Sequence, residues 1–268
     1  MFGTGNLENK GDCIMINVRY NYLIEDDKDL MDSKYDIENR VDPDSSSKTL
    51  YEDVKTVFFA NDNPEVLRQK YKNNPEFYTL VLHDNGIRLI STDYIGPSVH
   101  WAQSSEFTED EIRDFLRESR TIGGHVAWER GSNIPYKVNT ARGGEDGLYD
   151  RIDLTLLLLK IYKNSSDLNS FSKAANALLP EKCYESKRWE GMYNAFSASS
   201  WLNNHGFDDY CSKFMLYGSF VDEKDNVILM ADIYPILPND YHSYAKNVVE
   251  AIGKRNAQIN KEVKKQAF

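Results

Sequence analysis

The sequence has few cysteines and no recognisable metal-binding motif. Its three cysteines, Cys13, Cys183 and Cys211, are odd in number and widely separated. A secreted, disulfide-stapled domain has many paired cysteines, so reduced thiols in a cytoplasm are the simplest interpretation. Four of the histidines (His83, His100, His205, His242) also lack metal-ligand spacing. We therefore expect no metal site and no bound cofactor.

Long hydrophobic runs are missing as well. No apolar stretch approaches the roughly 20 residues that a membrane-spanning helix requires. The first twelve residues, MFGTGNLENKGD, lack the basic and apolar regions of a signal peptide and are expected to form a flexible N-terminus. These absences predict a cytoplasmic protein without a membrane partner.

Acidic residues are plentiful but unevenly placed. The chain has a formal net charge of -10, and residues 24–53 alone hold eleven acids and four bases. Because that stretch accounts for -7 of the net charge, the acidic pI does not imply that the whole protein surface repels nucleic acid. Residues 254–265 are basic. No broad basic surface typical of a dedicated DNA-binding protein is visible.

Hydrophobic periodicity predicts both strands and helices. Alternating apolar residues favour strands at 13–24, at 121–129 and around 217–233. Residues 77–92 read as a hairpin whose turn is Asp84-Asn85-Gly86. Helices are predicted at 49–59 (capped by Asp44 or Ser46), 64–71, 107–119, 150–162, 168–179, 181–203 and from about 240 onward.

These elements predict an α+β fold with antiparallel strands. The helix at 150–162 is apolar nearly all round, so it should lie at the centre of the core. The C-terminal half is mostly helical. No repeat or long linker marks a domain boundary, and residues 13–268 are expected to form one domain.

The first segment that could carry chemistry is Arg120-Thr-Ile-Gly-Gly-His125. The same spacing of Arg and His occurs on one helix turn in a large class of helical ribonucleases, but two glycines disfavour a helix here. His125 could act as a general acid or base. It could equally be a partly buried histidine bonded to the backbone. The glycine pair would let a ligand approach the backbone closely.

The second segment is Val138-Asn-Thr-Ala-Arg-Gly-Gly, which precedes the central helix. A guanidinium fork beside flexible backbone N–H groups is typical of anion sites, so Asn139, Arg142 and Gly143 are predicted to bind a phosphate. It is neither a Walker A motif nor a dinucleotide fingerprint. Asp150 and Asp153 could instead cap the helix and pair with Arg142 and Arg151, which would be a purely structural role.

Three segments taken in order resemble a bacterial family of uncharacterised proteins. The segments are TIGGH from Thr121, VNTARG from Val138 and DRIDLTL from Asp150. The resemblance covers residues 18–256 and implies a bacterial or phage-borne cytosolic protein without an assigned reaction. Two departures are notable: Glu129 stands where the family has proline, and some relatives have an aromatic residue in place of His125, which argues against an obligatory catalytic histidine.

Two hypotheses follow from the sequence. In the first, the protein is a metal-independent enzyme acting on a phosphate, nucleotide or RNA ligand, such as a toxin or phage-defence protein. His125 and Arg120 would be catalytic, Asn139, Arg142 and Gly143 would bind substrate, and Asp150, Arg151 and Asp153 would support them. In the second, the protein is a non-catalytic interaction protein or a homo-oligomer, and the polar segment is an internal salt-bridge network. The first hypothesis requires Arg120, His125, Asn139 and Arg142 to converge on an open pocket. The enzyme hypothesis fails if the arginines are all buried and paired with Asp150, Asp153 or Glu145.

Overall fold

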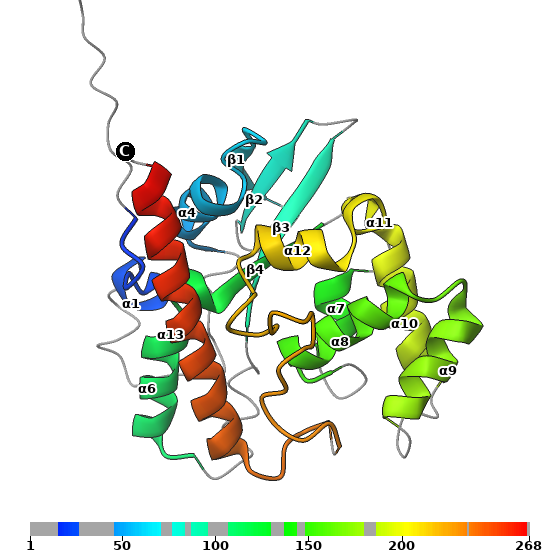
Figure 1. Ribbon diagram of the computed structural model, residues 1–268. Coiled ribbons are helices and arrows are strands. Elements are labelled where there is room, and N and C mark those ends of the chain that lie inside the picture. Colours follow the sequence, from blue (N-terminus) through cyan, green and yellow to red (C-terminus); the bar gives the residue numbers. More distant parts are fainter. Residues whose placement is uncertain are drawn as a thin grey trace, which may run out of the picture.

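The structure is a computed structural model that describes residues 16–26, 46–70, 77–83, 87–95, 107–129, 137–143, 148–179, 186–234 and 236–266. It has the predicted α+β fold, with a small sheet at one end and helices around and beyond it (Figure 1). The strands are β1 (Glu65–Gln69), β2 (Phe77–Leu82), β3 (Arg88–Tyr94) and β4 (His125–Glu129). The helices are α1 (Tyr22–Asp26), α4 (Lys48–Phe58), α6 (Glu109–Ser119), the 3-10 turn η2 (Ile122–Gly124), α7 (Val138–Arg142), α8 (Ile152–Lys163), α9 (Leu168–Leu178), α10 (Ser186–Ala198), α11 (Ser200–His205), α12 (Phe207–Lys213) and α13 (Tyr241–Gln266).

The sheet is antiparallel in the order β1-β2-β3-β4. The predicted β2–β3 hairpin is confirmed, with Leu80 opposite Ile90, while its turn lies outside the described residues. The helix predicted at 64–71 is wrong. Residues 65–69 pair with β2 as an edge strand, because hydrogen bonding to a neighbouring strand overrides a short segment's weak helical preference.

Helix α6 confirms the predicted start. The Thr108 hydroxyl accepts a hydrogen bond from the Glu111 backbone N–H, and the Glu111 carboxylate accepts one from the Thr108 backbone N–H. This capping box satisfies two otherwise unpaired donors. The other end of α6 leads through Arg120 and η2 into β4. Helix α4 is also confirmed, but Ser47 caps it rather than Ser46, and Asp44 lies outside the described residues.

The apolar helix α8 is central, as its sequence predicts. Leu154, Leu156, Leu158 and Leu159 are fully buried. Its start differs from the prediction, because Arg151 occupies the N-cap position without a side-chain capping bond. Asp150 instead adopts a left-handed backbone conformation with φ 59°.

The C-terminal half is mostly helical, with several differences from the prediction. The helix predicted at 181–203 is split at Ser199, which caps α11, and α12 was not predicted. The strand pair predicted around 217–233 is wrong: the segment forms a turn at residues 222–226 and only isolated bridges, from Val221 to Tyr217 and Val227. The long helix α13 is confirmed and packs against α6 and η2 (Figure 1).

The strand predicted at 13–24 is also wrong within the described part. A turn at residues 18–19 is followed by the helix α1. Tyr22 is buried and donates its hydroxyl to Asp53 on α4, and among the described residues this segment is not paired with a strand of the sheet. In the described part of the chain, no helix is long and apolar enough to cross a membrane.

Candidate functional site

Arg142, at the end of α7, is fully buried and bonded on three sides. Its guanidinium donates to the Asp93 carboxylate and the Asp150 carbonyl, and its Nε donates to Thr155 Oγ1 at 3.2 Å. Burial alone would lower the pKa of Arg142, but the nearby carboxylates of Asp93 and Asp150 raise it above its usual value. Arg142 is therefore a charged group inside the fold that joins α7, β3 and α8.

The backbone of Arg142 also holds a strained turn. Its carbonyl accepts from the N–H groups of Leu148 at 2.7 Å and Asp150 at 3.0 Å. Tyr149 and Asp150, which come shortly before α8, have positive φ angles of 52° and 59°, respectively. Such conformations cost of order 1–3 kcal/mol each in non-glycine residues and persist only where surrounding contacts impose them. Arg142 supplies those contacts.

Gly143 and Asn139 complete the predicted binding segment. The Gly143 N–H donates to the Asn139 carbonyl at 3.2 Å, which closes the short helix α7. A Cβ atom on Gly143 would lie 3.3 Å from the Asp150 carboxylate. The missing side chain therefore makes room for Asp150. Asn139 is half-buried one helical turn before Arg142.

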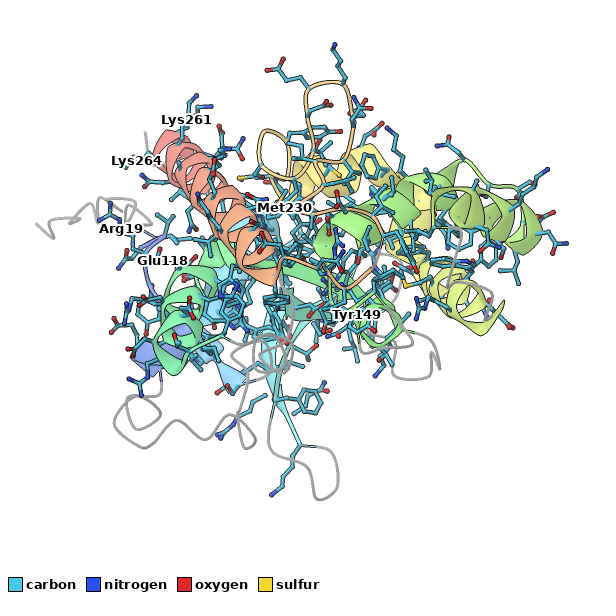
Figure 2. The ribbon with its side chains drawn as sticks, turned by 90° about the horizontal axis from the view of Figure 1, so that it is seen from below. Arg19, Glu118, Tyr149, Met230, Lys261 and Lys264 are labelled. Carbon is cyan, nitrogen blue, oxygen red and sulfur yellow. The ribbon has the colours of Figure 1, made fainter. Side chains whose placement is uncertain are left out.

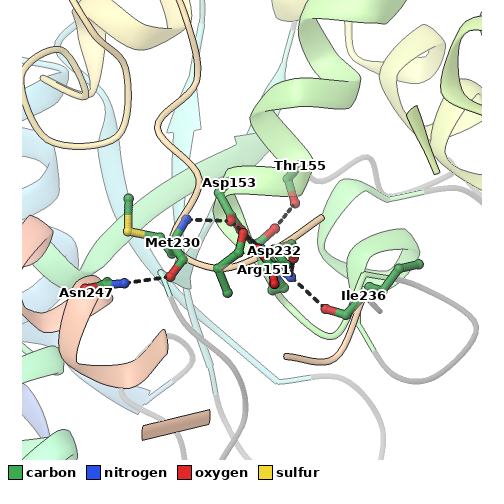
Figure 3. A network of polar contacts seen from close by, with 8 residues as sticks. Arg151, Asp153, Thr155, Met230, Asp232, Ile236 and Asn247 are labelled. Carbon is green, nitrogen blue, oxygen red and sulfur yellow. Dashed lines mark hydrogen bonds and ion pairs between the residues drawn. The ribbon is translucent and has the colours of Figure 1, made fainter. Parts of the chain in front are cut away.

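Arg151 and Asp153 form a second buried ion pair (Figure 3). Two guanidinium N–H groups of Arg151 donate to the two Asp153 oxygens at 3.1 and 2.6 Å. The remaining donors bind the carbonyls of Ala231, Asp232 and Ile236 at 2.8–3.2 Å, and Asp153 also accepts from the Met230 N–H at 3.0 Å. This pair anchors the irregular segment before α13 onto the start of α8.

The glycine pair before His125 serves helix packing. A Cβ on Gly124 would lie 1.6 Å from the Ser119 carbonyl oxygen. A Cβ on Gly123 would lie 2.5 Å from the Asn256 side chain, which accepts the Gly123 N–H at 2.8 Å. Because glycine has no side chain, α6 and α13 can pack closely against the backbone at these two positions.

His125 is fully buried at the start of β4. Its Nδ1 lies 2.8 Å from the Thr121 carbonyl, which accepts a hydrogen bond from it, and its ring meets the Tyr22 ring edge-on at 5.7 Å. Burial lowers the pKa of His125 to about 3, and the charges of Arg120 and Arg255 act in the same direction. At neutral pH the imidazole is therefore neutral and enclosed by protein.

Arg120 is buried where α6 ends. Its guanidinium carbon lies 4.1 Å from the centroid of the Tyr94 ring, and its Nη1 donates to Ser119 Oγ at 3.0 Å. Tyr94 is the residue after Asp93, and its carbonyl lies 3.4 Å from Arg142 Nη1. Arg120 contacts Tyr94 and Arg142 contacts Asp93, which are neighbouring residues of β3. β3 thus brings the two arginines together, as the phosphate-site hypothesis requires, but it does so inside the protein.

Two tyrosines at the start of α13 were not among the predicted site residues. Tyr241 and Tyr244 are buried with ring centroids 5.9 Å apart. The Tyr241 hydroxyl has no hydrogen-bond partner among the described residues, whereas the Tyr244 side chain lies beside Arg151 and helps to raise the pKa of that guanidinium. Burial raises the pKa of both; the charges of Arg120 and Asp150 act on Tyr241, and those of Asp153, Arg151 and Arg142 on Tyr244. Both tyrosines therefore lie within the influence of buried charged groups.

Arg255 is a fourth buried arginine that sequence reasoning missed. Its guanidinium donates to the carbonyls of Phe214, Gly123 and His125 at 2.6–2.8 Å, and burial lowers its pKa to about 9. Its place on the apolar stripe of α13, three residues after Ile252, could have identified it. It joins α12, η2 and β4 to α13.

No group of three or more His, Cys, Asp or Glu side chains suited to a metal ion occurs among the described residues.

The family to which the chain belongs follows from its match to a protein-family model. A model of a family of unknown function, DUF6994, matches residues 27–259. The chain belongs to this family. No curated protein and no solved structure matches it.

The DUF6994 match confirms the family of unknown function that the sequence resembles. The structure also shows the role of Glu129. The Glu129 carboxylate accepts from Ser199 Oγ at 3.0 Å, Ser200 Oγ at 3.0 Å and the Trp201 N–H at 3.1 Å. Glu129 therefore ties the end of β4 to the N-terminus of α11.

The buried histidine predicts a pH-dependent stability. The folded-state pKa of His125, about 3, lies below the ordinary value of 6.5. The neutral, buried His125 therefore contributes fully to the free energy of unfolding above pH 6.5, and this contribution is lost as the pH falls toward 3. We expect the wild type to lose about 2 kcal/mol more than His125→Phe between pH 7 and pH 5, at about 1.4 kcal/mol per pH unit. Urea unfolding at both pH values measures this difference. Equal losses in the two proteins would show that His125 is not a buried neutral group.

Proposed function

We propose that this protein binds a small phosphate-bearing ligand, of the nucleotide class, at the buried polar cluster beside the start of α13. The cluster consists of Arg120, Asp150, Tyr241 and Tyr244. The observation that carries the proposal is the buried Tyr241 hydroxyl, which has no partner among the described residues. Leaving a buried polar group unsatisfied costs about 1–3 kcal/mol, so such groups call for a bound water, ion or ligand.

The chemistry of the cluster suits a phosphate ester. A phosphate oxygen accepts hydrogen bonds, and the Tyr241 O–H group can donate to it beside the positive charge of Arg120. The Asp150 carboxylate, whose charge also acts on Tyr241, accepts hydrogen bonds and suits the hydroxyl groups of a ribose. A nucleotide carries both kinds of group.

The proposal gives the other predicted residues supporting roles. Arg142 and Arg151 donate to Asp93 and Asp153, and we propose that they hold the strained turn and the segment before α13 in place. His125 is neutral and fully buried, bonded to Thr121 through Nδ1. We therefore propose ligand binding without assigning an acid–base step to His125.

Tyr241→Phe tests the proposal. Removal of an unsatisfied hydroxyl is expected to leave the ligand-free protein equally stable or more stable by up to about 1 kcal/mol. In the wild type, one of inorganic phosphate, AMP, ATP or a dinucleotide should raise the melting temperature, since a ligand at 100 times its Kd adds about 2.7 kcal/mol. The variant should lose most of that increase.

Tyr162→Phe is the matched control. Its hydroxyl donates to Asn203 at 2.6 Å in an exposed position outside the buried cluster, so its removal should leave the ligand response unchanged. The proposal fails if no probe raises the wild-type melting temperature, or if Tyr241→Phe responds as strongly as the wild type.

A further inference from the structure

A stack of two aromatic rings lies where α6 and α13 begin. The Phe107 and His242 rings are parallel to within 6°, and their centroids are 4.1 Å apart. In both overall views this end of α13 lies beside α6, opposite the end that carries Lys261 and Lys264 (Figures 1 and 2). The stack therefore joins the N-terminal ends of two neighbouring helices.

The stack adjoins the buried polar cluster that is proposed to bind a phosphate. The Phe107 ring meets the Tyr241 ring edge-on, with an interplanar angle of 88° and centroids 5.2 Å apart. Tyr241 is 4% exposed, and its hydroxyl is the donor without a partner among the described residues. Phe107 thus contacts both the proposed phosphate-binding tyrosine and the ring of His242.

His242 is held on Phe107 by contacts at the surface. Its side chain is 53% exposed, and its Nε2 lies 3.4 Å from a carboxylate oxygen of Glu111, which is itself 45% exposed. Ion pairs between exposed side chains contribute little to stability, and exposed side chains change rotamer within picoseconds to nanoseconds. The His242 ring can therefore leave the face of Phe107 at small cost.

The face of Phe107 that His242 covers suits a nucleobase. Bases stack on aromatic side chains whatever their identity, because every base has a π-face, and one stacked base strengthens binding by roughly fivefold to a hundredfold. The imidazole of His242 is the same five-membered heterocycle that forms part of a purine. In a nucleotide the sugar alone separates base from phosphate, and Phe107 is likewise in direct ring contact with Tyr241.

We infer that Phe107 stacks on the base of the nucleotide, and that His242 occupies the place of the base in the ligand-free protein. The inference rests on the proposed function, in which Tyr241 and Arg120 hold the phosphate. The arriving base displaces the His242 ring toward solvent and stacks on the face of Phe107 that it leaves. The site therefore prefers nucleotides to sugar phosphates that lack a base.

Isothermal titration calorimetry with ribose 5-phosphate, AMP and GMP tests the inference. The wild type should bind AMP and GMP at least about tenfold more tightly than ribose 5-phosphate. Phe107→Leu keeps an apolar side chain but has no aromatic face. It should lose at least about tenfold in affinity for the two nucleotides and much less for ribose 5-phosphate. Tyr241→Phe should weaken the binding of all three ligands.

Nuclear magnetic resonance of the histidine rings tests the displacement directly. The chain has five histidines, and the spectrum of His242→Ala identifies the signal of His242. The Phe107 ring should shift that signal in the ligand-free protein, because the two rings are stacked. AMP should return it to the position of an exposed histidine, whereas ribose 5-phosphate should leave it unchanged.

His205→Ala is the matched control. The His205 ring also stacks on an aromatic side chain, that of Trp201, with centroids 4.8 Å apart. Its removal should change the affinity for none of the three ligands. His242→Ala should bind AMP at least as tightly as the wild type, because the place of the base is then vacant. Urea unfolding verifies that every variant is folded.

The outcomes separate the inference from the proposed function. Equal wild-type affinities for the three ligands, each weakened by Tyr241→Phe, would overturn the inference and leave the phosphate site standing. Equal losses for all three ligands in Phe107→Leu would give Phe107 a structural role only, and a base preference that survives in this variant would place the base elsewhere. Both results contradict the inference. If none of the ligands binds the wild type, the proposed function and the inference are both wrong.

Discussion

Gly124→Ala is expected to lower the free energy of unfolding by about 3 kcal/mol or more. The added Cβ would lie 1.6 Å from the Ser119 carbonyl oxygen, a backbone atom that cannot move aside as a side chain can. Relief requires the end of α6 to separate from η2, and overpacking that moves backbone typically costs about 1–3 kcal/mol or more. Urea unfolding followed by circular dichroism measures the loss.

Gly191→Ala is the matched control. Gly191 lies inside α10, and a Cβ there would meet nothing within 4 Å. Alanine is the better helix former, so this variant should gain about 0.5–1 kcal/mol. If Gly124→Ala were as stable as the wild type, the close contact of η2 with α6 would be wrong, and a ligand would again explain the glycine.

Arg142→Met is expected to lower the free energy of unfolding by about 3–5 kcal/mol. The substitution leaves the 2% exposed Asp93 as a buried carboxylate without its guanidinium partner, and such losses are of this size. It also removes the hydrogen bond to the Asp150 carbonyl within the strained turn. Denaturant unfolding of the single variant measures the combined effect.

The double variant Arg142→Met/Asp93→Leu separates charge from packing. Since the second substitution removes the unpaired carboxylate, the double variant should lose less than the sum of the two single variants. Arg117→Met is the control, because Arg117 and Asp114 form an exposed pair at 2.6 Å, which contributes about 0.5 kcal/mol or less. A loss below about 1 kcal/mol for Arg142→Met would contradict a structural ion pair and favour a ligand-binding arginine.

The buried arginines explain why a phosphate-site pattern arises in the sequence. An arginine next to glycines and upstream of a helix has the same appearance whether its guanidinium binds an external anion or an internal carboxylate. Asp93 lies 49 residues before Arg142, in a strand whose pattern does not mark it as a partner. The sequence could therefore name Arg142 but could not choose between the two roles.

Local physical chemistry within the sequence determined much of the fold. Thr108 with Glu111 defines the start of α6, two apolar runs around a turn define the β2–β3 hairpin, and the unbroken leucines of α8 place it in the core. Each signal involves residues close together in the chain, so composition and periodicity are sufficient.

Tertiary contacts decided the rest. β1 is a strand because β2 lies beside it, and the segment at 217–233 is irregular because Asp153 and Arg151 bind its backbone. Gly124 is required by the Ser119 carbonyl, and Tyr241 comes under the charges of Arg120 and Asp150 only after α13 has packed. These features depend on partners far away in the chain. They also depend on burial, which sets the strength of the interactions between charges and exists only in the folded protein.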